Sequence, residues 1–123
     1  PLIDCGGYLA TERGCSQERQ SYTVMMILTD GIIDDKDETI QSIIRASNTP
    51  LSILIIGIGD EDFTEMDYLD GDEKLLEQGG AKAVRDIVQF VPFKKFMQQG
   101  PVALAQSVLA EIPSQIISYI IMI

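Results

Sequence analysis

An aspartate follows the first long apolar run of this sequence, at a position where a carboxylate can do chemistry. Asp30 comes after the run of residues 24–28 and stands between Thr29 and Gly31. If that run is a strand of an open α/β sheet, ligands collect in the crevice beyond its carboxyl end. A carboxylate there suits Mg²⁺ or Mn²⁺, which take a few carboxylates and complete their shell with hydroxyls and water. Asp30 is therefore the candidate metal ligand, and capping of an acidic turn or a helix is the alternative.

Two other patterns that would predict a ligand fail on spacing. Gly57 and Gly59 follow an apolar run as in a dinucleotide-binding turn, but the third glycine would stand at position 62, which is Asp62. The acids around that position would also repel a pyrophosphate. A calcium loop of the EF-hand type starting at Asp70 would need a glycine where Leu75 stands. Neither site is expected.

The charge of the chain excludes one class of partner. The 123 residues, enough for one domain at most, carry 19 acidic and 9 basic side chains, a formal net charge of −10. Residues 30–77 contain 14 acids and three bases, so this section alone holds the negative excess. A phosphate backbone would be repelled by it, and no nucleic-acid partner is expected.

Histidine and cysteine usage narrows the chemistry further. The chain has no histidine, which removes catalytic triads and histidine-containing zinc sites. Its two cysteines, Cys5 and Cys15, are too few for a disulfide scaffold and predict reduced thiols in a cytosolic protein. No signal peptide is apparent at the N-terminus. The apolar run of residues 116–123 is much shorter than the ~20 residues that span a bilayer.

Three apolar runs predict the strands that would position Asp30. Residues 24–28, 51–58 and 86–91 lack polar alternation, which is typical of strands buried on both faces of a parallel sheet. Strands that alternate with helices indicate an α/β domain with parallel pairing. Three strands are few for such a sheet, and the first run is as apolar as a central strand. We therefore expect part of a domain, in which that run needs a further neighbour.

Helices are expected between these runs. Ile40, Ile43 and Ile44 repeat at helical spacing after an acidic start, and Pro50 ends that helix. A weak N-terminal helix would have Leu2, Ile3, Tyr8 and Leu9 on one face, and a short helix is expected within residues 62–69. A last helix is expected from Pro101, broken or kinked at Pro113. Its apolar face would consist of Val102, Ala105, Val108, Leu109 and Ile112. Residues 11–20 and 70–80 resemble polar loops. The terminal run 116–123 is either a docked helix or an exposed contact face.

Several short motifs together resemble the copine family. They are residues 22–31, 37–39, 45–47, 50–53 and 56–59, Asp62-Phe63 with Met66, Leu69-Asp70, residues 85–93, and residues 109–113 with Gln115. Residues 85–93 are the most specific match, and the resemblance covers roughly residues 22–120. It implies that residues 1–123 are the C-terminal portion of a copine von Willebrand factor A-like domain, with residues 1–21 as a helix or loop lead-in. The implied fold is part of a Rossmann-type, doubly wound, mainly parallel sheet flanked by helices.

The resemblance also bears on the metal site. A domain of this kind holds its ion with an Asp-x-Ser-x-Ser loop, a threonine, and an aspartate at the end of a further strand, and Asp30 matches that last aspartate. The Asp-x-Ser-x-Ser motif does not occur in this sequence. The resemblance therefore implies an incomplete metal-ion-dependent adhesion site, with Mg²⁺ or Mn²⁺ held by Asp30 and water. Calcium is expected only through lipid-binding modules that these residues do not include.

The function implied by the resemblance is non-enzymatic. It is a module that binds intracellular target proteins and, in the intact cytoplasmic protein, recruits them to the plasma membrane in response to calcium, with membrane contact made by the lipid-binding modules. Two alternatives stay open. One is a metal-dependent hydrolase in which clustered acids such as Asp60 and Asp62 bind two magnesium ions and activate water. The other is a structural fragment that self-associates through an exposed sheet edge.

Overall fold

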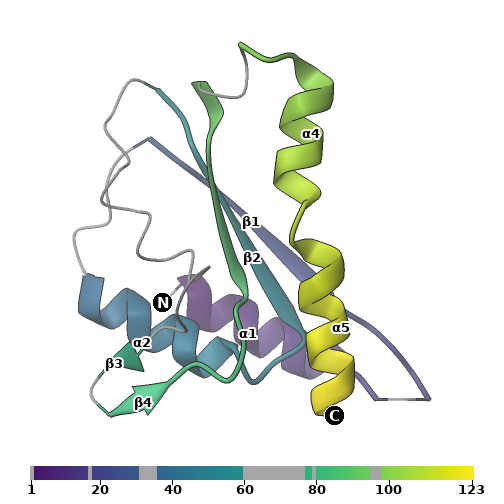
Figure 1. Ribbon diagram of the computed structural model, residues 1–123. Coiled ribbons are helices and arrows are strands. Elements are labelled where there is room, and N and C mark those ends of the chain that lie inside the picture. The colour runs from purple at the N-terminus through teal and green to yellow at the C-terminus, as the bar shows by residue number, and fades with distance from the viewer. Residues whose placement is uncertain (1, 17, 31–35, 60–76, 79, 95–97) are drawn as a thin grey trace.

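The computed structural model describes residues 2–16, 18–30, 36–59, 77–78, 80–94 and 98–123 (Figure 1). The elements are α1 (Leu2–Arg13), β1 (Thr23–Thr29), α2 (Lys36–Ala46), β2 (Leu51–Gly57), β3 (Glu77–Gln78), β4 (Ala81–Lys82), β5 (Val88–Pro92), α4 (Pro101–Leu109) and α5 (Ile112–Met122). The helix predicted within residues 62–69 lies outside the described residues, as does most of the predicted loop of residues 70–80.

The three predicted strands form one parallel sheet in the order β1-β2-β5. Thr23 lies opposite Leu51 at the start of the β1–β2 pair, and Ile53 lies opposite Val88 in the β2–β5 pair. Every residue of β2 is buried, which explains why its sequence is apolar except for Ser52. Helices cover both faces of the sheet (Figure 1), so the predicted α/β arrangement is confirmed. The short β3–β4 pair, which was not predicted, is antiparallel and forms a separate two-stranded sheet.

Strand β1 differs from the prediction in its burial. It was expected to be buried on both faces, but Val24, Met26 and Leu28 are 47%, 57% and 62% exposed. Their partners in the register point to the face that α4 and α5 cover, and the main contacts of these helices are with β2 and β5. In the described part of the chain, no strand pairs with the outer side of β1. One face of this strand is therefore apolar and open to solvent.

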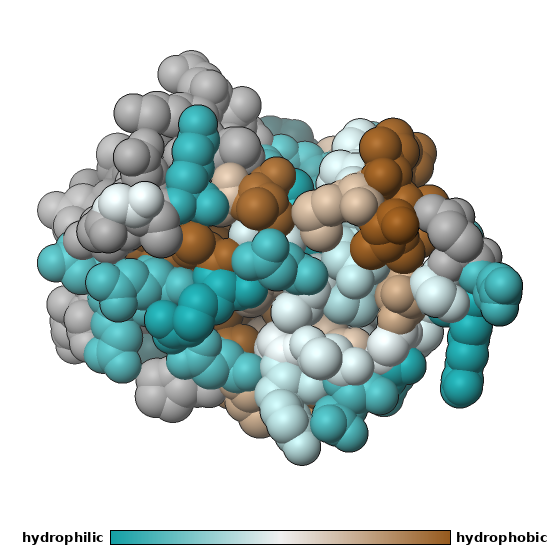
Figure 2. Space-filling model, turned by 90° about the horizontal axis from the view of Figure 1, so that it is seen from below, coloured by the Kyte–Doolittle hydropathy of each residue, from teal (hydrophilic) through white to brown (hydrophobic). Residues whose placement is uncertain are grey.

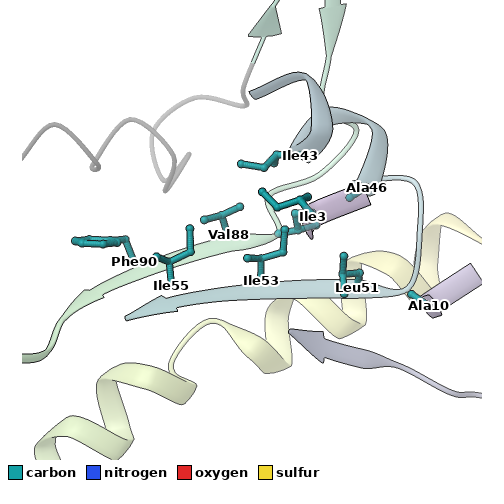
Figure 3. Packing of buried hydrophobic residues seen from close by; sticks show 10 residues of the cluster. Ile3, Ala10, Ile43, Ala46, Leu51, Ile53, Ile55, Val88 and Phe90 are labelled. Carbon is teal, nitrogen blue, oxygen red and sulfur yellow. The ribbon is translucent and has the colours of Figure 1, made fainter. Parts of the chain in front are cut away.

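Helices α1 and α2 cover the opposite face and close the main core. This core joins buried side chains of both helices with those of β2 and β5 (Figure 3). The residues are Ile3, Ala10, Ile43, Ala46, Leu51, Ile53, Ile55, Ile87, Val88 and Phe90. The helix predicted from Ile40, Ile43 and Ile44 is α2, and it docks with the isoleucine face that the sequence indicated.

Helix α1 docks on a different face from the one predicted. Leu2, Tyr8 and Leu9 are exposed, whereas the buried positions are Ile3, Gly6, Gly7 and Ala10. A Cβ atom on Gly6 would lie 2.6 Å from the Sδ atom of Met25, so the lack of a side chain permits the close approach of the helix to β1. Gly6 and Gly7 are therefore part of the packing surface of the helix. The helix also continues to Arg13, into the residues expected to form a loop.

The last two helices lie along the other face of the sheet (Figure 1). The predicted break at Pro113 is confirmed, because α4 ends at Leu109 and α5 begins at Ile112. The predicted apolar face of α4 is wrong in part: Val108 packs against the core with Leu104, whereas Val102 and Leu109 are exposed. The core on this side is small, with Leu54, Ile56 and Val91 as its buried residues. It leaves most of the apolar surface of α4 uncovered.

Helices α4 and α5 also change the expectation about membrane spans. Among the residues that the structure describes, Pro101–Met122 is the one helical stretch long and apolar enough, by length and composition, to cross a membrane. It has 22 residues and a mean hydropathy of 1.2. The sequence prediction considered only residues 116–123 and missed the contribution of α4. Leu104, Val108 and Tyr119 of this stretch face the sheet or bury against it, but few of its residues are buried.

Candidate functional site

Asp30 lies at the carboxyl end of the sheet, where the sequence placed it. It directly follows β1 and is exposed. The backbone N–H of Ile58 donates to the carbonyl of Thr29 at 2.8 Å, so β1 and β2 remain paired to their last residues. Beyond that bond the chain turns at Gly59, whose φ of 96° favours glycine. The carboxylate of Asp30 therefore faces solvent beside the exit turn of the central strand.

The donor set at this corner is small in the described residues. Within them, no group of three or more acidic, cysteine or histidine side chains gathers around one point that could hold a metal ion. The acids Asp60 and Asp62, predicted to lie nearby, are outside the described residues. Asp30 suits Mg²⁺ or Mn²⁺ as a ligand type, and it supplies one carboxylate. The role of Asp30 as a metal ligand stays a prediction.

A second polar cluster, centred on Arg85, lies at the opposite end of the strands. The Arg85 side chain is 6% exposed and makes five hydrogen bonds. Its Nε donates to the carbonyl of Ser47, Nη1 donates to Tyr22 Oη and to the carbonyl of Gln115, and Nη2 donates to the carbonyls of Thr49 and Leu51, over 2.6–3.1 Å. A guanidinium has five N–H donors, and all of them are used here.

Two tyrosines complete the surroundings of this guanidinium. Its Cζ lies 5.7 Å from the ring centroid of Tyr22 and 5.1 Å from that of Tyr119, distances typical of cation–π contacts. The two rings meet edge to face with centroids 6.2 Å apart. Burial, and secondarily the nearby Cys15, raises the pKa of Tyr119, while Arg85 acts in the opposite direction. The cluster joins the end of α2, the start of β2, α5 and the residue before β1.

This role of Arg85 was not predicted from the sequence. The residue was considered only as the first position of the motif of residues 85–93. A usable signal was present, since Arg85 comes just before an apolar run expected to be buried, and a buried charge must be compensated by several partners. Because no N–H of the guanidinium remains for a ligand, Arg85 holds elements together and does not bind an anion.

A pocket of about 290 Å³ adjoins the Arg85 cluster at the start of α5. Its lining residues come from the loop before β5, from the α4–α5 junction and from the first turns of α5: Arg85, Asp86, Ala110, Glu111, Ser114, Gln115 and Ser118. Two of these residues are hydrogen-bonded to each other: Ser118 Oγ donates to the backbone carbonyl of Gln115 at 2.7 Å. Sequence reasoning assigned no site to these residues.

The outer surface of α5 is apolar. Tyr119 and Gln115 are buried against the sheet side, whereas Ile117 and Ile121 are 59% and 79% exposed. Figure 2 looks at the end of the molecule where α5 ends and shows a brown hydrophobic group beside largely hydrophilic surface. Residues 116–123 were predicted to be either a docked helix or an exposed contact face. One side of α5 is docked and the other side is exposed. The exposed side is a surface of the kind that contacts partners.

Comparison with known proteins agrees with the motifs. The family model described as Copine matches residues 1–123, including the N-terminal residues that resembled the family least. Copine-A of Dictyostelium discoideum is 48% identical over 119 residues, which are 97% of this chain and 20% of that protein. Copine-E of the same organism is 50% identical over 109 residues, 87% of this chain and 19% of that protein. The chain spans about a fifth of the length of these curated relatives. It belongs to the copine family.

Proposed function

We propose that these residues form a non-enzymatic protein-interaction module of a copine. The observation that carries the proposal is the apolar surface left open on one face of the sheet. Val24, Met26 and Leu28 of β1 lie exposed on the face that α4 and α5 cover only in part. Apolar side chains grouped on one surface mark contact sites more often than isolated ones do. No reaction is assigned to the chain.

Asp30 is the proposed metal ligand of this module. Its exposed carboxylate stands at the end of the sheet where ligands bind in α/β folds. One carboxylate with water makes a weak site for Mg²⁺ or Mn²⁺. An acidic side chain of a partner would add a second carboxylate, and the ion would then link the two proteins. The cation also supplies the positive charge that lets an acidic partner approach a chain of net charge −10.

Calorimetric titration of the chain with Mg²⁺ tests the role of Asp30. We expect weak binding that Asp30→Ala removes, because the only proposed protein ligand is lost. Glu18→Ala, which removes an exposed acid far along the chain from the site, is the matched control and should bind like the wild type. Equal Mg²⁺ affinity in wild type and Asp30→Ala would exclude Asp30 as a ligand. Phosphoester turnover that Asp30→Asn abolishes would favour the hydrolase alternative instead.

The wider role belongs to the intact copine. Because the chain spans about a fifth of its relatives, recruitment of target proteins to membranes, calcium-dependent lipid contact and a cytoplasmic location with plasma-membrane association are all proposals for the full-length protein. To these roles, the residues of this chain would contribute the interaction surface and Asp30. Self-association through the edge of the sheet is the alternative use of β1, since β1 has no partner strand on its outer side in the described residues. A chain that stays monomeric at all concentrations in light scattering would argue against that use.

A further inference from the structure

The outward surface of α4 and α5 carries no charged side chain. Twelve residues between positions 101 and 123 are exposed, and only Gln106 and Ser114 among them are polar. The one acidic or basic residue of this stretch, Glu111, is half-buried and lines the pocket beside Arg85. Figure 1 shows α4 and α5 following one another along the outside of the molecule. An uncharged, mostly apolar surface therefore runs along both helices.

The apolar side chains of this surface repeat at intervals of three or four residues, which places them on one side of the helices. We call them the outer strip: Val102, Ala105, Leu109, Pro113, Ile117 and Ile121. The four large side chains of the outer strip are between 59% and 79% exposed. Other residues, such as Val108 and Tyr119, hold the helices on the sheet. The outer strip is thus not needed for the packing of α4 and α5.

The lack of charge distinguishes between the possible occupants of the outer strip. An interface between proteins has an apolar centre and a polar rim, and paired helices select partner and register through charges beside their apolar stripe. No exposed residue beside the outer strip carries such a charge. A second copy of the chain would also bring a net charge of −10 against an equal charge. The apolar interior of a bilayer requires neither a rim nor a register.

The packing of the two helices determines how they meet a bilayer. Residues 101–122 are long and apolar enough to span one. Their inner side, however, packs against the sheet, and the helix is interrupted between Leu109 and Ile112. Spanning would remove both helices from the sheet and expose the core beneath them. A contact in the plane of the membrane keeps that core and buries only the outer strip, as amphipathic helices at membrane surfaces do.

We propose that the outer strip binds the surface of a lipid bilayer, with α4 and α5 in the membrane plane and their outward side chains at the boundary between headgroups and acyl chains. The contact needs no calcium, because no exposed carboxylate of this surface has to be bridged to a headgroup. It is additional to the calcium-dependent lipid contact proposed for the intact copine. The acidic chain is repelled by anionic lipid, so a zwitterionic surface is preferred.

Flotation of the chain with phosphatidylcholine vesicles in the presence of chelator tests the proposal. We expect the wild type to float with the vesicles and phosphatidylserine to weaken this binding. Ile117→Ser/Ile121→Ser should lower the partition coefficient about tenfold or more, because two isoleucines no longer enter the bilayer. Leu2→Ser/Leu9→Ser is the matched control, since it changes two exposed apolar residues of α1, and it should partition like the wild type. All four positions are exposed, so both variants should keep the wild-type circular dichroism.

A fluorescence measurement locates the helix at the bilayer while keeping its surface apolar. The chain has no tryptophan, so Ile121→Trp introduces a single indole on the outer strip. Lipids brominated in their acyl chains should quench the emission of Ile121→Trp and leave that of Leu9→Trp unchanged.

Four results would overturn the proposal: no flotation of the wild type without calcium or anionic lipid, an equal loss in both double variants, no quenching of Ile121→Trp, or a lipid-free dimer that Ile117→Ser/Ile121→Ser dissociates. In the last case a second copy of the chain covers the outer strip. The proposal rests on neither Asp30 nor the open face of β1, so none of these results changes the Mg²⁺ titration.

Discussion

The two ends of the parallel sheet use their charged side chains in opposite ways. At the amino end, the buried guanidinium of Arg85 donates all of its N–H groups to protein acceptors and contacts two tyrosine rings. At the carboxyl end, Asp30 is exposed, beside a glycine turn. A charge buried this deeply is tolerated only when it is fully compensated, whereas an exposed carboxylate keeps its lone pairs for a ligand. The amino end thus uses its charge to hold elements together, whereas the carboxyl end leaves its charge exposed.

The largest effect is expected from removing the buried cation. Arg85→Met should lower the free energy of unfolding by about 3 kcal/mol or more, because several buried carbonyl oxygens lose their donor. Arg45→Met is the control: Arg45 pairs with Asp4 at 3.0 Å, but its side chain is 57% exposed, so the loss should be below about 1 kcal/mol. Urea denaturation followed by circular dichroism measures both.

Arg85→Lys extends this test to a variant that keeps the charge. Lysine has three donors on one nitrogen and cannot reproduce the five bonds of the planar guanidinium. We expect a stability between those of the wild type and Arg85→Met. If Arg85→Met and Arg45→Met lowered the free energy of unfolding equally, the buried charge of Arg85 would be no more important for stability than an exposed one. The contrast between the two ends of the sheet would then be wrong.

An intermediate effect is expected at alkaline pH. Because burial raises the pKa of Tyr119 above its ordinary value of about 10, the folded chain keeps this proton at a pH where the unfolded chain loses it. Stability should therefore fall as the pH rises above about 10, with a slope from this group of at most about 1.4 kcal/mol per pH unit. Tyr119→Phe should flatten that part of the curve, and Tyr8→Phe, at an exposed position, should not. Identical alkaline curves for wild type and Tyr119→Phe would contradict the assignment.

The smallest effect is expected at the carboxyl end. Asp30→Ala should change the free energy of unfolding by less than about 0.5 kcal/mol in metal-free buffer, as is usual for an exposed residue. Chemical denaturation with chelator present measures this. If Asp30→Ala lowered the free energy of unfolding by about 1 kcal/mol or more, Asp30 would cap the turn, which is the structural alternative for this residue.

The sequence predicted the strands well because their signal is local. A strand covered on both faces is apolar at nearly every position, and in β2 the one polar side chain, Ser52, is buried and hydrogen-bonded to Tyr22. Residues 24–28 carry the same signal, yet β1 is half exposed, because its burial depends on what packs beside it. Asp30 was placed correctly because a residue after a parallel strand necessarily lies at the sheet's carboxyl end. Periodicity therefore located the elements but not their neighbours.

Helix faces and buried polar contacts were harder to predict. The docking face of α1 contains Gly6 and Gly7, which carry no hydrophobic signal and matter only because β1 and α2 approach them closely. The partners of Arg85 stand 30 to 63 residues away along the chain, so no local pattern indicates them. The pocket at Gln115 likewise requires the loop before β5 to meet the start of α5.

Composition and local patterns were enough to establish the absence of histidine chemistry, the acidic charge, the α/β class and the copine resemblance, since each depends on residues close together in the chain or on totals. Folding was needed to establish which apolar surfaces stay open, that Arg85 is saturated with hydrogen bonds, and that the Gln115 amide is buried without a partner. These properties arise from contacts between distant segments, and burial and hydrogen-bond saturation exist only once those segments have met.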